Sequence, residues 1–181
     1  MPSHIDVRRG RWQQAMVANA KAIEANRAYR RQSPKYGFYG LYIAHDSHMF
    51  AFAAMMNGQR AEALRAIDDL VASMPEQWTI DYAAIADGYQ VMPLEVRMRF
   101  GLWDEVLAAP DFPQRFPFAR AMRHYARGVA HAAKGDTKQA RAAQSEFLAA
   151  SKAAADGMFG NNKTSDLLAI AADVLEGEIL Y

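Results

Sequence analysis

The sequence predicts an all-α fold of antiparallel helix pairs, and three observations support this prediction. A six-residue motif recurs four times, beginning at Gly10, Gly58, Gly101 and Gly135. It consists of glycine, any residue, a large residue, two further residues and a small or apolar residue. Each copy lies between two segments with helical patterning, which is typical of a helix–turn–helix repeat array. Alanine is abundant and β-branched residues are sparse, so intrinsic propensity also favours helices.

Composition limits the classes of partner. The 181 residues include 21 basic and 20 acidic side chains, and this near-neutral balance gives no reason to expect nucleic acid or an anionic membrane surface as a partner. The absence of cysteine excludes disulfides and thiolate metal sites. The sequence has no stretch resembling a signal peptide and no apolar run of about 18 residues that would cross a bilayer. We therefore expect a soluble, cytoplasmic protein.

Patterning and breaker residues locate the expected elements. Three prolines exclude regular helix from 110–117, because proline removes a donor and fixes φ. Loops are expected at 32–37, 74–76 and 156–162, no strands are expected, and Pro93 is expected to kink or restart the helix around it. The expected helices are 3–9, 11–30, 40–57, 60–73, 79–100 (interrupted), 103–109, 117–134, 137–154 and 164–178.

These helices group into one repeat domain, residues 1–181. Within each turn, glycine permits the positive φ of a tight connection, and the small residue lets two helices approach closely. The expected units are 1–31, 39–73, 79–110 and 117–154, followed by an open terminal helix at 164–181.

The fourth unit has the pattern of a known repeat. Gly101 and Gly135 are 34 residues apart, the length of a tetratricopeptide repeat. The positions of that motif are occupied by Tyr125, Gly128, His131, Gly135, Thr137, Ala140, Gln144 and Phe147, with Thr137 and Gln144 replacing the usual aromatics. The chain therefore resembles the tetratricopeptide-repeat (TPR) superfamily. The resemblance implies a short superhelix in which the first helix of each pair lines a concave groove.

A closer resemblance is to a group of uncharacterised bacterial repeat proteins. It rests on segments 1–5, 45–50, 99–105 and 125–128 and covers most of the chain. Members of that group are usually longer, so this chain is similar to a shorter or partial member. The group implies no particular activity.

Counting back from the turn glycines places candidate ligand-binding residues on the concave side. His45 and His48 lie 13 and 10 residues before Gly58, and their i, i+3 spacing puts them on one helix face. The residues expected to line the groove are His4, His45, His48, Glu95 and Tyr125. His124 and His131 lie outside this set, and His131 is expected in the core.

Two interpretations of the three groove histidines remain open. In the first, His4, His45 and His48 bind a divalent transition metal such as zinc, with Glu95 or Asp46 completing the ligand set and a bound water serving hydrolysis. In the second, the histidines hydrogen-bond within the groove or stack on aromatic side chains, and this interpretation is favoured because His-x-x-His is common by chance.

We accordingly expect a TPR-like scaffold that binds a peptide or protein partner in its groove. The alternative is a metal-binding protein or metal-dependent hydrolytic enzyme that uses the histidine cluster. Neither a nucleophile elbow nor a phosphate-binding loop is present in the sequence. The aromatics Tyr36, Phe38, Tyr39 and Tyr42 either rim a small-molecule site or plug the stack where the loop crosses it, and the plug is favoured.

The end of the array also predicts self-association. Residues 167–175 are largely apolar around the whole helix circumference. Terminal repeats need a polar outer face or a partner, so we expect a homo-oligomer formed through one or both exposed repeat ends. The competing expectation is that the last helix folds back on the preceding pair.

Overall fold

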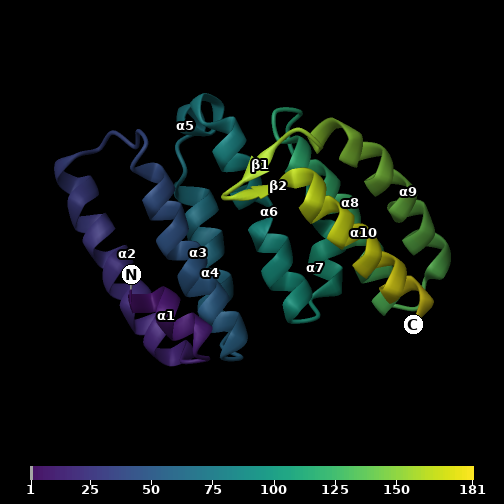
Figure 1. Cartoon of the computed structure of the whole chain (residues 1–181), viewed down its shortest axis with the longest axis horizontal. Coiled ribbons are helices and arrows are strands. Elements are labelled where there is room, and N and C mark those ends of the chain that lie inside the picture. The colour runs from purple at the N-terminus through teal and green to yellow at the C-terminus, as the bar shows by residue number, and fades with distance from the viewer. Residues whose placement is uncertain (1) are drawn as a thin grey trace. The chain divides into compact units, whose positions relative to one another are not determined.

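A computed structural model describes residues 2–181 and confirms the all-α class (Figure 1). The helices within this range are α1 (Pro2–Arg8), α2 (Trp12–Gln32), α3 (Gly40–Met56), α4 (Arg60–Ser73), α5 (Glu76–Asp81), α6 (Ala83–Arg99), α7 (Trp103–Ala108), α8 (Pro117–Ala133), α9 (Thr137–Ala154) and α10 (Thr164–Leu180). The chain divides into two compact units, unit 1 (Met1–Thr79) and unit 2 (Ile80–Tyr181). No helix in the described range is both long enough and apolar enough to cross a membrane.

The four glycine motifs adopt the same turn. Their glycines have φ between 67° and 77°, a region that L side chains avoid. In every copy the residue after glycine donates its N–H to the carbonyl five residues earlier, as Gln59 does to Ala54 at 2.9 Å. This is the hydrogen bond of a Schellman helix end. The next helix begins two residues after each glycine, and the last residue of each motif is buried.

In unit 1, α3 packs between α2 and α4 (Figure 1). The contact surfaces are rich in alanine, which allows close approach of the helices, and the fully buried alanines include Ala15, Ala44, Ala54 and Ala63. Trp78 follows α4, and its Nε1 donates to the Gly37 carbonyl at 2.7 Å. The buried Tyr36 ring lies 5.2 Å from the Trp78 ring. These contacts hold the loop between α2 and α3 against Trp78.

In unit 2, α8 is the central helix and contacts α6, α7, α9 and α10. Its first turn is capped from α6, because the Asp87 carboxylate accepts the backbone N–H groups of Phe118 at 2.9 Å and Ala119 at 2.8 Å. Gly128 lets α10 approach α8, since a Cβ there would lie 2.8 Å from a Leu175 methyl. The terminal helix α10 packs on both α8 and α9, which is the fold-back arrangement.

Two local predictions are wrong. The helix expected over 79–100 is interrupted as predicted, but the interruption lies at Tyr82, where φ is −119° and ψ is 36°, and not at Pro93, through which α6 continues. The loop expected at 156–162 contains a short antiparallel hairpin of β1 (Met158–Phe159) and β2 (Asn162–Lys163). Gly160 supplies a positive φ of 59° at the turn. The Phe159 ring lies 5.5 Å from the Tyr89 ring, and this tertiary contact stabilises the hairpin.

Candidate functional site

A continuous series of hydrogen bonds joins five polar residues of unit 1. The Tyr39 hydroxyl donates to Asn26 Oδ1 at 2.7 Å, and Asn26 Nδ2 donates to Asp46 Oδ2 at 3.0 Å. Asp46 Oδ1 lies 3.2 Å from His45 Nδ1, and His45 Nε2 lies 3.3 Å from His4 Nε2. We call these residues the polar chain. Its members come from α1, α2, α3 and the residue before α3, so packing of three helices assembles it.

The hydrogen bonds determine the imidazole tautomers. A carboxylate can only accept, so His45 carries its proton on Nδ1 and donates it to Asp46. With both imidazoles neutral, His45 Nε2 is then the acceptor for His4 Nε2–H. This leaves His4 Nδ1 as an acceptor that is buried without a hydrogen-bond partner among the described residues. Burial lowers the pKa of His4, and the neighbouring His45 lowers this pKa further, so the neutral form of His4 is favoured.

The geometry of the His4–His45 pair suits either a hydrogen bond or a bound ion. The ring centroids are 5.1 Å apart but the two Nε2 atoms only 3.3 Å, so the rings meet by their nitrogen edges. A tetrahedral zinc ion with Zn–N bonds of about 2.0–2.1 Å holds its ligand nitrogens at a similar separation. Among residues 2–181, however, no group of three or more histidine or acidic residues is arranged to hold a metal ion. The predicted three-histidine ligand set therefore gains no support.

His48 lies one turn beyond His45 on α3, outside the polar chain. Burial lowers the pKa of His48 to about 4, and a smaller contribution comes from the nearby His45. His48 is therefore neutral at pH 7. The structure thus brings His4 and His45 into direct contact and places His48 beside them.

Glu95 and Tyr125, the other two predicted groove residues, belong to unit 2. They lie on α6 and α8, which pack against each other. Burial raises the pKa of Glu95 to about 7. Burial also raises the pKa of the Tyr125 hydroxyl, and the negative charges of Glu178 and Glu95 raise that pKa further. A carboxyl group that titrates near neutrality can exchange a proton at physiological pH.

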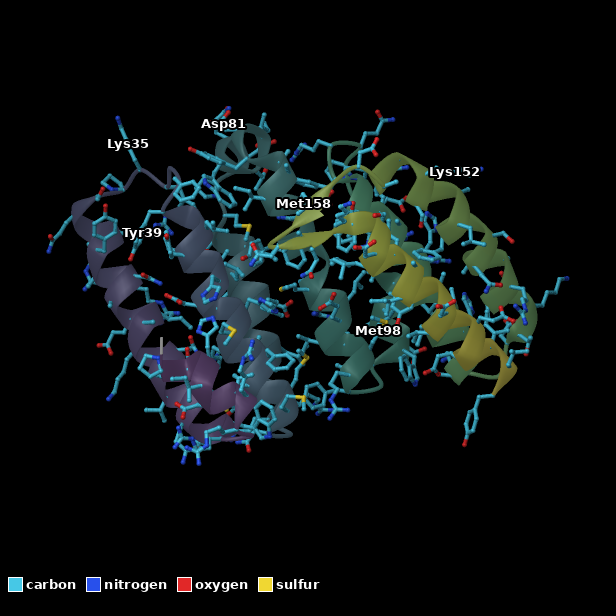
Figure 2. All side chains as sticks on the ribbon, viewed as in Figure 1. Lys35, Tyr39, Asp81, Met98, Lys152 and Met158 are labelled. Atoms are coloured by element: carbon cyan, nitrogen blue, oxygen red, sulfur yellow. The ribbon has the colours of Figure 1, made fainter. Side chains whose placement is uncertain are left out.

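An aromatic surface adjoins the polar chain. We define the aromatic patch as Tyr29, Phe38, Tyr39 and Tyr42, whose exposed fractions are 45%, 60%, 37% and 51%. Their rings form a continuous cluster with neighbouring centroids 4.7 to 6.3 Å apart. Figure 2 shows Tyr39 at the loop end of α2 and α3. Of the aromatics expected to plug the stack, Tyr36 does so, whereas the other three are exposed.

Asn26 is the site residue that the sequence reasoning missed. It is buried and connects Tyr39 with Asp46. Asn19 lies two helical turns before Asn26 on the same face of α2. It is also buried, and its Nδ2 donates to the Ala15 carbonyl at 2.8 Å. Two asparagines seven residues apart in an alanine-rich helix are a detectable signal, because asparagine disfavours helix interiors unless its side chain has partners.

Comparison of the chain with family models, curated proteins and solved structures finds no match. Membership of the TPR superfamily therefore stays a prediction based on the residues quoted above. The polar chain fixes the orientation of its side chains, but the Asn26 amide neither gains nor loses a proton and therefore interrupts proton transfer between Tyr39 and Asp46. It contains neither a serine nor a cysteine nucleophile, so it does not form a triad of the acyl-transfer type.

Proposed function

We propose that the protein is a TPR-like scaffold that binds a peptide or protein partner, and that the aromatic patch is its main contact surface. The observation that carries the proposal is the exposure of four clustered aromatic side chains on one end of unit 1. Tyrosine and phenylalanine are enriched in interfaces, where they bury large areas at low entropic cost. Exposed apolar clusters on a soluble surface commonly mark such sites.

The polar chain supports this role by fixing part of the patch. Tyr39 is held by its hydrogen bond to Asn26, which in turn is anchored on Asp46. A side chain that is already ordered loses less conformational entropy when a partner binds, so the same contact yields higher affinity. We propose His4, His45 and His48 as ligand-contact residues of unit 1, and Glu95 and Tyr125 as ligand-contact residues of unit 2.

A random peptide library displayed on phage tests the proposal. We expect selected peptides to bind the wild-type protein, and the double variant Phe38→Ser/Tyr42→Ser to weaken that binding at least tenfold. Both side chains are more than half exposed, so their loss should leave the thermal midpoint unchanged. Met158→Ser is the matched control, because Met158 is 51% exposed in unit 2. Selected peptides that bind the double variant as tightly as the wild type would contradict the proposal.

A second candidate function is metal binding by His4 and His45, with metal-dependent hydrolysis as its catalytic extension. The specific observation is the 3.3 Å separation of the two Nε2 atoms together with the Asp46 carboxylate at His45 Nδ1. Carboxylates commonly orient metal-bound imidazoles in this way. Two protein ligands would leave coordination positions for water, which a bound metal activates.

Calorimetric titration with zinc tests this second candidate. Stoichiometric binding that is lost in His4→Gln and His45→Gln, but retained in His124→Gln, would support it. His124 is a suitable control because it lies in unit 2 and pairs with Glu146 at 2.9 Å. The absence of binding heat, or equal loss in all three variants, would exclude a zinc site formed by the pair.

A further inference from the structure

Unit 1 contains a cavity of about 700 Å³ that is lined by Asn26 of the polar chain but by no histidine and by no residue of the aromatic patch. Its size lies within the range of roughly 300–1,000 Å³ typical of small-molecule sites. Three helices form its walls, and α2, α3 and α4 lie side by side in Figure 1. Ile43, Ser47 and Phe50 line it from α3, on a different face from His45 and His48. We call it the arginine cavity.

The charge of the arginine cavity is unbalanced. Arg27 and Arg30 line it from α2 and Arg65 from α4, while Asp69 is its one acidic lining residue. None of these four residues forms an ion pair with another residue in the described part of the chain. The cavity therefore presents an excess of positive charge that the protein does not itself neutralise, and an anionic group entering it would be attracted.

Arg30 is the best-positioned of the three cations. Its guanidinium lies 4.4 Å from the centroid of the Tyr36 ring, which orients it by a cation–π contact. Its Nε is buried and has no hydrogen-bond partner in the described residues. A buried donor without an acceptor costs free energy, and an anionic oxygen bound in the cavity would satisfy it. Ser47, a buried residue, supplies a hydroxyl on the opposite wall.

Apart from the polar side chains of Asn26 and Ser73, the remainder of the lining is apolar. Ile43 and Leu70 are buried, and Ile23 and Phe50 are half-buried beside them. Alanines complete the walls at Ala20, Ala66 and Ala72. A ligand that matched this surface would combine one anionic head with an apolar body, because either part alone would leave half of the lining unsatisfied.

We propose that the arginine cavity binds a small amphipathic anion. Its carboxylate or phosphate head lies against the Arg30 guanidinium, and its apolar body lies against Ile43, Phe50 and Leu70. This site is separate from the aromatic patch, none of whose residues lines the cavity, so it goes beyond the proposed scaffold function. Unit 1 would therefore contain both a small-molecule site, the arginine cavity, and the proposed partner-binding surface, the aromatic patch.

Isothermal titration with defined probes tests the proposal. Octanoate and octyl phosphate, kept below their micelle concentrations, should each bind with one-to-one stoichiometry, and their relative affinities identify the preferred head group. Acetate lacks the apolar body and octylammonium carries the wrong charge, so both should bind at least tenfold more weakly. Failure of both amphipathic anions to bind, or equal binding of octylammonium, would overturn the proposal.

Variants of neighbouring arginines localise the binding. Arg30→Met should weaken the better probe about tenfold or more, as expected for loss of a charge-assisted hydrogen bond of at least 1.4 kcal/mol. Arg31→Met is the matched control, because Arg31 is exposed on α2 and does not line the cavity. Equal losses in the two variants would contradict the assignment.

A second variant tests the cavity without relying on Arg30→Met, whose effect on binding could also arise from a change in folding. Ala66→Trp places a large side chain in the cavity from α4 and should abolish binding while thermal unfolding shows a cooperative transition. Amide chemical shifts in the wild-type protein should move at the cavity helices on addition of the probe. Shifts confined to unit 2, or unchanged binding by a folded Ala66→Trp protein, would overturn the proposal.

Discussion

At the scale of single residues, His45 illustrates how position determines chemistry. Its Nδ1–H is fixed by Asp46, so its Nε2 faces His4 as an acceptor. His48, only three residues later, lies outside this network, and burial sets its pKa. His45 is therefore oriented by Asp46 of α3 and His4 of α1, whereas burial dominates the environment of His48.

His48 should make the protein sensitive to acid. Its folded-state pKa of about 4 lies below the ordinary value of 6.5, so the unfolded chain takes up a proton first as the pH falls. Stability should therefore decrease as the pH falls from 6.5 to 4, by at most on the order of 3–4 kcal/mol from this group. An NMR titration should find His48 neutral at pH 5. A midpoint near 6.5 would contradict the expectation.

Asn26 should contribute more to stability than Tyr39. Asn26→Ala removes the acceptor of the Tyr39 hydroxyl and a donor to Asp46, leaving part-buried polar groups unpaired, and should cost about 1–3 kcal/mol. Tyr39→Phe removes one donor and should cost about 0.5–1.5 kcal/mol. Urea unfolding of both variants measures the difference. A smaller loss in Asn26→Ala than in Tyr39→Phe would argue against the polar chain as described.

At the scale of elements, helix boundaries follow from local chemistry and were predictable to within a few residues. The turn at Gly58 requires only a positive φ and the helix-forming residues around it, all of which lie close together in the sequence. The break at Tyr82 and the hairpin at Met158–Lys163 depend on packing between distant segments, such as Phe159 against Tyr89. The place of Asn26 in the polar chain is not predictable from the sequence for the same reason, since Asn26 and Asp46 are brought together only by helix packing.

Two glycines should respond in opposite ways to alanine. Gly135 has φ of 77° in a turn, so Gly135→Ala should destabilise the protein by roughly 1–2 kcal/mol. Gly177 lies within α10 with open space around the position of a Cβ. Gly177→Ala should therefore stabilise it by about 0.5–1 kcal/mol. Thermal or urea unfolding measures whether each substitution raises or lowers the free energy of unfolding. Equal changes at both positions would refute the turn assignment.

The cap of α8 provides a second element-scale prediction. Asp87→Ala would leave the N–H groups of Phe118 and Ala119 without their acceptor, and should lower stability by about 1–2 kcal/mol. Asp87→Asn retains one carbonyl oxygen and should lose less. Amide hydrogen exchange at the first turn of α8 should accelerate in the alanine variant. Unchanged protection there would contradict a capping role.

At the scale of the whole molecule, we propose self-association through α10. This helix packs on α8 and α9 but exposes Ile170 and Val174, one turn apart, with exposed fractions of 62% and 43%. Ile170→Asp/Val174→Asp should shift the protein towards the 20.2 kDa monomer in sedimentation experiments. A wild-type protein that sediments only as a monomer at high concentration would contradict the proposal.

Photo-crosslinking in cells tests the central proposal, partner binding through the aromatic patch, most directly. A photoreactive phenylalanine at position 38 should form a discrete covalent adduct with a partner protein, whereas the same group at the exposed Lys152 of unit 2 should not. The adduct at position 38 should also disappear on adding Tyr42→Ser. Adducts of equal yield at both positions, or an adduct that persists with Tyr42→Ser, would contradict a binding surface at the aromatic patch.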